Sequence, residues 1–186
     1  MKVAFRRTGT RRYAVIVRRT GEPERALDPA PGYDDDIPHD LVHYVVEAEL
    51  GLSDGVYGRA ARGAGTFIST AQQDVSPRER ARKQRKQQKR ERALGAHDAR
   101  HGAEMARSER LAALCDVTWR RKHGQRADPG RSPPALPAED AGDVERIVAR
   151  LDVLAPLWRA LPVDAELMDA ELVFEWPGLL PDQGSR

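Results

Sequence analysis

One stretch decides the fold of this chain: Asp36-Ile37-Pro38-His39-Asp40-Leu41-Val42-His43-Tyr44-Val45-Val46-Glu47-Ala48-Glu49-Leu50. Pro38 is typical of a first helical turn, where its missing N–H would have no intrahelical partner. The apolar residues of the stretch recur at helical spacing, and Gly51 can end the helix with a left-handed cap. The stretch therefore predicts an amphipathic helix over residues 38–50.

The same helix would present three polar side chains on one side. His39, His43 and Glu47 follow one another at steps of four residues, and each such step rotates only about 40° around the helix axis. Two His at i and i+4 can bind one metal ion, as in H-E-x-x-H helices. We therefore name His39, His43 and Glu47 as candidate ligands of a divalent metal ion. Zinc is the metal that we expect first. Asp40 takes the place of the catalytic Glu of that motif and is the candidate catalytic residue, which would polarise water or orient a ligand.

Other interpretations of this group stay open. Glu47 could orient His43 without touching the metal. Hydrolytic chemistry requires a coordination position open to water. There are two further alternatives. One is a purely structural role, with a hydrogen-bonded and half-buried His43, and the other is a metal-free acid–base site. The sequence defines no substrate and does not decide whether the protein is an enzyme. Completing ligands are available by type at Glu49, Asp34, Asp35, His97, His101 and His123.

The His-Asp-x-x-His stretch from His39 to His43 resembles the zinc-ligand motif of the Coq4 family, which is linked to ubiquinone biosynthesis. The resemblance implies a bound zinc ion at the two His. That family has a Glu further along, at a position where this chain carries Gly55, and the acids here come earlier, at Glu47 and Glu49. The whole chain also looks like uncharacterised proteins of high-GC bacteria, which implies no activity.

Alternating apolar residues predict strands at both ends of the chain. Residues 2–7 and 11–18 form a hairpin pattern around Thr8-Gly9-Thr10, and residues 171–176 alternate again. Because a lone hairpin is marginally stable, the last strand should join the first two. The buried side of this sheet should carry Tyr13, Val15, Val17, Leu172, Phe174 and Trp176.

Between these strands the apolar period changes to that of helices. Helices are predicted over residues 38–50, 104–122 and 143–158, and Pro156 should end or kink the last of them. The predicted fold is α+β: a small antiparallel sheet, built from the N-terminal hairpin and the C-terminal strand, packed against about three main helices. An exposed basic helix or arm would accompany it.

That basic element is Arg78–Arg92, with nine basic and two acidic residues. Such a helix can lie along the phosphates of nucleic acid, and it also fits an acidic protein surface. The alternatives are a solvated arm or pairing with residues 139–175, which carry ten acids and three Arg. An anionic membrane surface is disfavoured by the missing apolar face. The candidate nucleic-acid contacts are Arg78, Arg82, Arg85, Lys86, Lys89 and Arg90.

Length and composition set the remaining bounds. The 186 residues predict one domain over 1–186, with a protruding or flexible basic segment at 72–102 and a Pro-rich loop at 127–138. The formal charge is only +2. Without a membrane-length apolar run or a signal-peptide core, a cytoplasmic location is expected. Cys115 is the only cysteine, so an internal disulfide is excluded. We expect it to be a buried small hydrophobe, with a nucleophile paired to His43 or His123 as the alternative.

Overall fold

The computed structural model of the chain describes residues 1–69, 78–79, 82, 85–86, 89, 99–124, 135–163 and 170–181. Within these residues, five antiparallel strands form one sheet, and four α-helices accompany it. The α+β fold predicted from the change of apolar period is confirmed.

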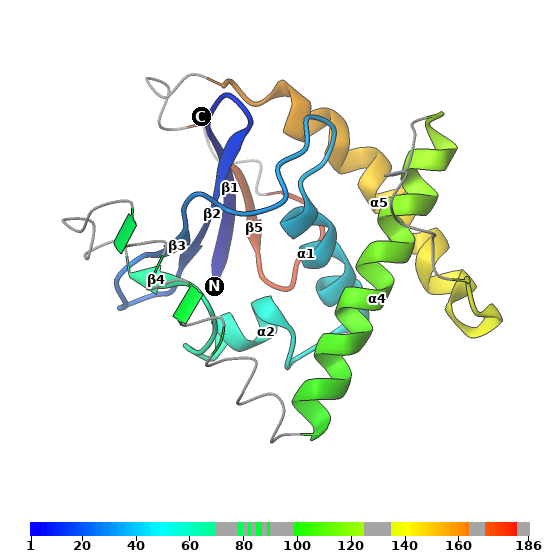
Figure 1. The fold of residues 1–186 in the computed structure, drawn as a ribbon, viewed down its shortest axis with the longest axis horizontal. Coiled ribbons are helices and arrows are strands. Elements are labelled where there is room, and N and C mark those ends of the chain that lie inside the picture. Colours follow the sequence, from blue (N-terminus) through cyan, green and yellow to red (C-terminus); the bar gives the residue numbers. More distant parts are fainter. Residues whose placement is uncertain are drawn as a thin grey trace.

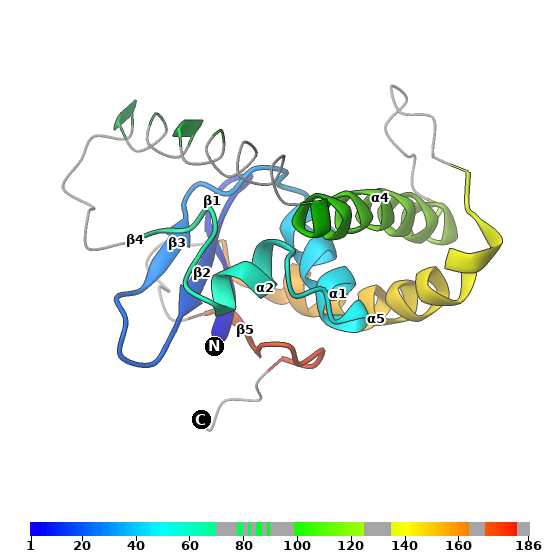
Figure 2. The same ribbon diagram turned by 90° about the horizontal axis from the view of Figure 1, so that it is seen from below.

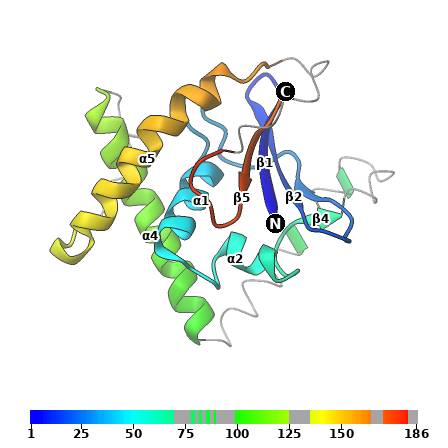
Figure 3. The ribbon, with the colours of Figure 1, turned by 180° about the vertical axis from the view of Figure 1, so that it is seen from behind.

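The sheet joins the two ends of the chain. Its strand order is β4-β3-β2-β1-β5, and Figure 3 shows the late strand β5 beside β1. Phe5 of β1 pairs with Val15 of β2 on one side and with Leu172 of β5 on the other. The predicted hairpin and the predicted third strand are both confirmed. The strands are β1 (Lys2–Gly9), β2 (Arg12–Arg18), β3 (Arg25–Leu27), β4 (Ile68–Ser69) and β5 (Leu172–Glu175).

The side chains of each strand alternate between the two faces of the sheet, as expected from the period of two. One face belongs to the main core and carries Val3, Phe5, Tyr13, Val15, Val17, Leu27, Leu172 and Phe174. On the other face Ala4, Ala14 and Ile16 form a smaller buried cluster. A polar contact also links β2 to the residue before β5: Arg18 donates to both Glu171 carboxylate oxygens at 2.6 and 2.8 Å.

The helices lie on the main-core side of the sheet, at two distances from it. Figures 1 and 2 show α1 (His39–Leu50) beside the sheet, with α4 (Ala99–Lys122) and α5 (Ala141–Ala160) farther out. The short α2 (Val56–Ala61) follows α1. Tyr44 of α1 anchors this packing, with its ring 6.0 Å from Phe5 and 4.7 Å from Phe174 between centroids. Helix α1 therefore rests on the sheet, with α4 on its outer side.

Helix α1 ends where its sequence predicts but begins one residue later, at His39. Pro38 occupies the N-cap, and Gly51 caps the C-terminus with φ 62°, a conformation that favours glycine. The cap N–H of Gly51 donates to Ala48 O, so one terminal carbonyl is satisfied. These local signals fix where the two His of α1 stand along the helix.

Two predicted helix boundaries are wrong. Helix α4 begins at Ala99, before residue 104, and α5 runs through Pro156 to Ala160. Pro156 removes one backbone donor, but the turn after it is fixed by tertiary contacts: Ala155 and Trp158 are buried, and the Trp158 indole N–H donates to Asp34 O at 3.0 Å. Burial of the final turn therefore outweighs the local helix-breaking signal.

Parts of two predicted segments lie outside the described residues. This applies to most of the basic segment 72–102 and to residues 127–134 of the Pro-rich loop. The loop's last described portion, residues 135–137, leads into the 3-10 turn η2 (Ala138–Asp140) and then α5. No helix in the described ranges has the length and apolar character needed to cross a membrane.

Candidate metal centre

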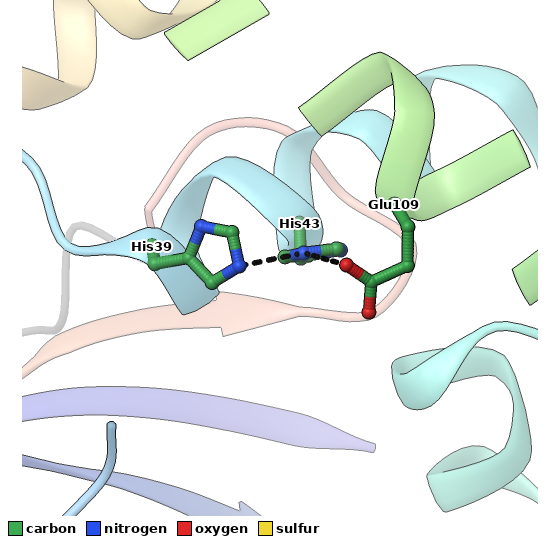
Figure 4. A group of neighbouring side chains, drawn as sticks. All are labelled: His39, His43 and Glu109. Atoms are coloured by element: carbon green, nitrogen blue, oxygen red, sulfur yellow. Dashed lines mark hydrogen bonds and ion pairs between the residues drawn. The ribbon is translucent and has the colours of Figure 1, made fainter. Parts of the chain in front are cut away.

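The start of α1 and the middle of α4 bring three ligand-type side chains together. His39 and His43 come from successive turns of α1, and Glu109 comes from α4. Figure 4 shows the two rings and the carboxylate converging on one another. The His pair follows from local spacing, whereas Glu109 arrives only because α4 packs across α1.

The distances among these groups are short enough for one ion. His39 Nε2 lies 3.0 Å from His43 Nε2, and His43 Nε2 lies 3.7 Å from Glu109 Oε2. One ligand atom from each residue falls within 4.8 Å of the others. His43 is buried, His39 is half-buried, and the Glu109 side chain is 64% exposed. The group therefore has a closed side at His43 and a solvent side at Glu109, and it could hold a metal ion.

His43 is kept neutral by its surroundings. Burial lowers its pKa to about 3, and the neighbouring His39 acts in the same direction. Its second ring nitrogen, Nδ1, lies 3.0 Å from the Ser108 hydroxyl. A metal-binding imidazole must be unprotonated on the ligating nitrogen, and it usually makes a hydrogen bond through the other. His43 is neutral, and its Nδ1 has such a hydrogen-bond partner in Ser108.

Glu47 lies outside the His39–His43–Glu109 group. Its carboxylate accepts the Val56 N–H at 2.9 Å and the Tyr57 N–H at 2.8 Å, so it satisfies the first amides of α2. It also accepts the Ser108 hydroxyl at 3.0 Å. Burial raises the pKa of Glu47 to about 7, although these hydrogen bonds oppose the shift. The structure thus directs the Glu47 carboxylate to α2 and Ser108.

Gly55 makes this position of Glu47 sterically allowed. It is the N-cap of α2 and is buried against the Glu47 side chain. A Cβ added to Gly55 would overlap the Glu47 carboxylate. The glycine is therefore required by close approach, not by an unusual backbone angle, since its φ is −70°.

Asp40 faces the sheet. Its Oδ2 accepts the Tyr13 hydroxyl at 2.5 Å, and its backbone carbonyl accepts the Tyr57 hydroxyl at 2.8 Å. Burial raises the pKa of Asp40 to about 6, and the Tyr13 hydrogen bond and His39 oppose the shift. Asp40 therefore adjoins the candidate centre through His39 while its carboxylate is held by Tyr13.

Other ligand-type residues named from the sequence have different partners. Glu49 pairs with Arg146 at 3.0 Å, and Asp34 accepts the Asp36 and Ile37 amides at 2.8 and 3.1 Å. His123 lies 2.8 Å from Asp152. His97 lies outside the described residues, and only the helical backbone of His101 is described.

Glu109 and Ser108 are the site residues that sequence reasoning missed. Both belong to the helix pattern of residues 104–122, and neither stands in a motif with His39 or His43. The only local signal is that buried Ser108 is a polar residue on the apolar side of α4. Their role could be found only after α1 and α4 were placed against each other.

The fold and the site define an α+β protein with a His-His-Glu group at a helix crossing. Comparisons with protein-family models, with curated proteins and with solved structures find no match for this chain. Its function is therefore argued from the site alone.

Proposed function

We propose that this protein binds a divalent metal ion, zinc above others, through His39 Nε2, His43 Nε2 and the Glu109 carboxylate. The supporting observation is the spacing of the ligand atoms. Tetrahedral zinc with bonds of about 2.0–2.1 Å places its ligands about 3.3 Å apart, and the two neighbouring pairs here are separated by 3.0 and 3.7 Å. The exposed Glu109 side chain can adjust to the ion, while buried His43 gives a fixed point.

Two His and one Glu form a ligand set that leaves the fourth zinc position to water. The ion would be solvent-accessible on the Glu109 side, because that side chain is 64% exposed. Bound zinc lowers the pKa of water to about 7, so we infer hydrolase-like chemistry as the reaction class. The Asp40 carboxylate is held by Tyr13, so Asp40 would act on the site only through the neighbouring His39.

The proposal is tested by metal titration of protein purified without a His tag and stripped of metal. Zinc is titrated calorimetrically and cobalt by visible absorption, whose intensity distinguishes tetrahedral from octahedral coordination. We expect one ion per chain, no saturable binding in His39→Ala/His43→Ala, and affinity weakened at least about 10-fold in Glu109→Gln. His123→Ala is the matched control, because His123 follows the end of α4 and pairs with Asp152.

Equal binding by the native chain and the double variant would refute the site. So would the absence of stoichiometric binding by the native chain. Loss of binding in Glu47→Gln with full retention in Glu109→Gln would return the third ligand to the residue predicted from the sequence.

A second candidate function is nucleic-acid binding by the basic segment. Arg78, Arg82, Arg85, Lys86 and Lys89 are helical and exposed, while Arg90 lies outside the described residues. On a regular helix these five positions fall within an arc of about 100°. Acids of residues 139–175 pair elsewhere in the described part of the chain, for example Asp140 with Arg110 and Glu171 with Arg18. These two observations favour a basic face directed to an external polyanion.

Mobility-shift assays with mixed RNA and DNA at several salt concentrations test this candidate. Removing a cation that binds one phosphate should reduce the salt slope by about 1, so Arg82→Gln/Arg85→Gln/Lys89→Gln should bind more weakly and with a shallower salt dependence. Arg150→Gln, on the exposed side of α5, is the control for loss of a single cation outside this segment. No retardation at low salt would eliminate the candidate.

A further inference from the structure

Glu47, Ser108 and His43 form a continuous hydrogen-bonded chain through the junction of α1 and α4. The Ser108 Oγ lies 3.0 Å from Glu47 Oε1 and 3.0 Å from His43 Nδ1. Ser108 and Glu47 are 0% exposed, and His43 is 5% exposed. Because buried polar groups satisfy one another inside the protein, the positions of the hydrogens along this chain follow from its ends.

Glu47 sets the donor-to-acceptor direction of these hydrogen bonds. An ionised carboxylate only accepts hydrogen bonds, and Glu47 also accepts the Val56 and Tyr57 amides at the start of α2. Ser108 has one hydroxyl hydrogen and must donate it to Glu47. Its lone pairs remain for His43 Nδ1, so Nδ1 carries the hydrogen and donates to Ser108.

The consequence appears on the opposite side of the His43 ring. A neutral imidazole has one N–H, so a hydrogen on Nδ1 leaves Nε2 with its lone pair. Nε2 is the atom that lies 3.0 Å from His39 Nε2 and 3.7 Å from Glu109 Oε2. In the metal-free protein, His39 Nε2 then donates to His43 Nε2. With Glu47 ionised, this is the one assignment of hydrogens that satisfies every contact from His39 to Glu47.

We propose that Ser108 and Glu47 are positioning residues of the metal centre, which hold His43 in the Nδ1–H tautomer and present its Nε2 to the ion. The ion itself rests on the proposed function, whereas the tautomer belongs to the metal-free protein as well. Glu47 sets the direction of these hydrogen bonds and also accepts the first amides of α2. The position of α2 and the affinity for metal are therefore coupled.

The tautomer is measured by two-bond ¹H–¹⁵N correlation spectra of labelled, metal-free protein. The pH is kept at about 8, above the burial-raised pKa of Glu47 of about 7, so that its carboxylate is ionised. We expect His43 in the Nδ1–H form in the native chain and in Ser108→Thr, which keeps the hydroxyl. In Ser108→Ala the acceptor is lost, and the Nε2–H form should become populated. His123, paired with Asp152, is the internal reference and should not change.

Zinc titration of the same variants gives the second measurement. Removing an outer-shell partner of a metal-bound His weakens affinity about 10–100-fold, so Ser108→Ala should bind zinc that much more weakly and Ser108→Thr nearly as the native chain does. Glu47→Gln should resemble Ser108→Ala, because its amide can donate to Ser108 and reverse the chain. Thermal melts establish whether each variant is folded. If Ser108→Ala does not fold, the zinc affinities of Ser108→Thr and Glu47→Gln test the positioning role.

The outcomes separate this inference from the metal site. An Nε2–H tautomer in the native chain, or tautomer populations that are equal in the native chain and Ser108→Ala, overturns the positioning role. Native zinc binding with unchanged affinity in Ser108→Ala and Glu47→Gln also overturns it but leaves the metal site intact. If the native chain binds no zinc, the proposed function fails, and the tautomer measurement alone decides whether Ser108 and Glu47 orient His43.

Discussion

His43 and Glu47 lie one turn apart on α1, and the same burial acts on them in opposite ways. Desolvation disfavours the charged form of any group, so it lowers the pKa of His43 to about 3 and raises that of Glu47 to about 7. Each residue is compensated by hydrogen bonds, His43 to Ser108 and Glu47 to two α2 amides. For single residues, the surroundings decide whether a side chain is a ligand, an anchor or an acid.

Glu47 should make stability depend on pH. Its folded pKa, about 7, is above the ordinary value of 4.5, so the folded state keeps a proton that the unfolded chain loses. The stabilisation is complete below pH 4.5 and is lost as pH rises toward 7, by up to about 3 kcal/mol at roughly 1.4 kcal/mol per pKa unit. Urea unfolding of metal-free native chain and Glu47→Gln across this range measures it. A difference between the two proteins that does not vary with pH would contradict the prediction.

Cys115 should behave as an inert core residue. It is 0% exposed, and burial raises its thiol pKa to about 12, with Asp116 acting in the same direction. Because the thiolate is the reactive form, a disulfide reagent should react at least about 100-fold more slowly with folded protein than with protein in denaturant. The folded rate should also lack the rise between about pH 7 and 9 that an ordinary thiol shows. Rapid labelling of the folded chain would instead favour the nucleophile interpretation.

Among the helices and strands, α2 is placed by a side chain of α1. The Glu47 carboxylate replaces the side-chain cap that Gly55 cannot supply, because the N-cap of α2 makes no side-chain hydrogen bond of its own. Helix α2 has only six residues, too few to be stable alone. Its position therefore depends on Glu47 and on the buried ring of Tyr57.

Gly55→Ala tests this arrangement. The added Cβ would overlap the Glu47 carboxylate, and overpacking of this kind costs about 1–3 kcal/mol. Gly142→Ala is the matched control, since its Cβ would meet only the tip of Arg146 at 3.7 Å in helix α5, and alanine there should be neutral or stabilising by up to about 1 kcal/mol. Denaturant midpoints at unchanged slope measure both. Equal midpoints for the two variants would show that Glu47 does not need the space at Gly55.

In the molecule as a whole, the first and last strands are neighbours, so the core closes only when both ends of the chain are present. Phe174 of β5 is 0% exposed and meets Phe5 of β1 edge-on at 5.9 Å and Tyr44 of α1 at 4.7 Å. The C-terminal strand thus completes the apolar floor on which α1 rests.

Phe174→Ala should accordingly destabilise the whole fold. Removal of a buried Phe ring costs about 3–5 kcal/mol, because apolar burial is lost and a cavity remains. Glu175→Ala is the neighbouring control: its side chain is 61% exposed and pairs with Lys2 at 3.8 Å, so it should change stability by less than about 1 kcal/mol. Chemical unfolding followed by both fluorescence and circular dichroism measures the change. A small effect of Phe174→Ala would mean that β5 is peripheral to the core.

The local parts of this protein could be predicted from its amino-acid pattern. Spacing placed His39 and His43 on one side of α1, and alternation placed Val15 and Phe174 on the buried side of the sheet. These features depend on periods of about 3.6 and 2 residues, which any short segment carries within itself. Strands as short as β3 and β4, with three and two residues, carry too little of a pattern to be found.

The acid that completes the candidate centre, by contrast, was selected by the packing of distant helices. Glu47 and Glu109 are the same type of ligand, and spacing favoured Glu47. In the structure, however, the α2 amides and Ser108 hold the Glu47 carboxylate, while the crossing of α4 brings Glu109 to within 3.7 Å of His43. The helical period fixes the direction of a side chain from its own axis. The groups that it meets depend on how helices distant in sequence pack, and that packing is set by the burial of the whole core.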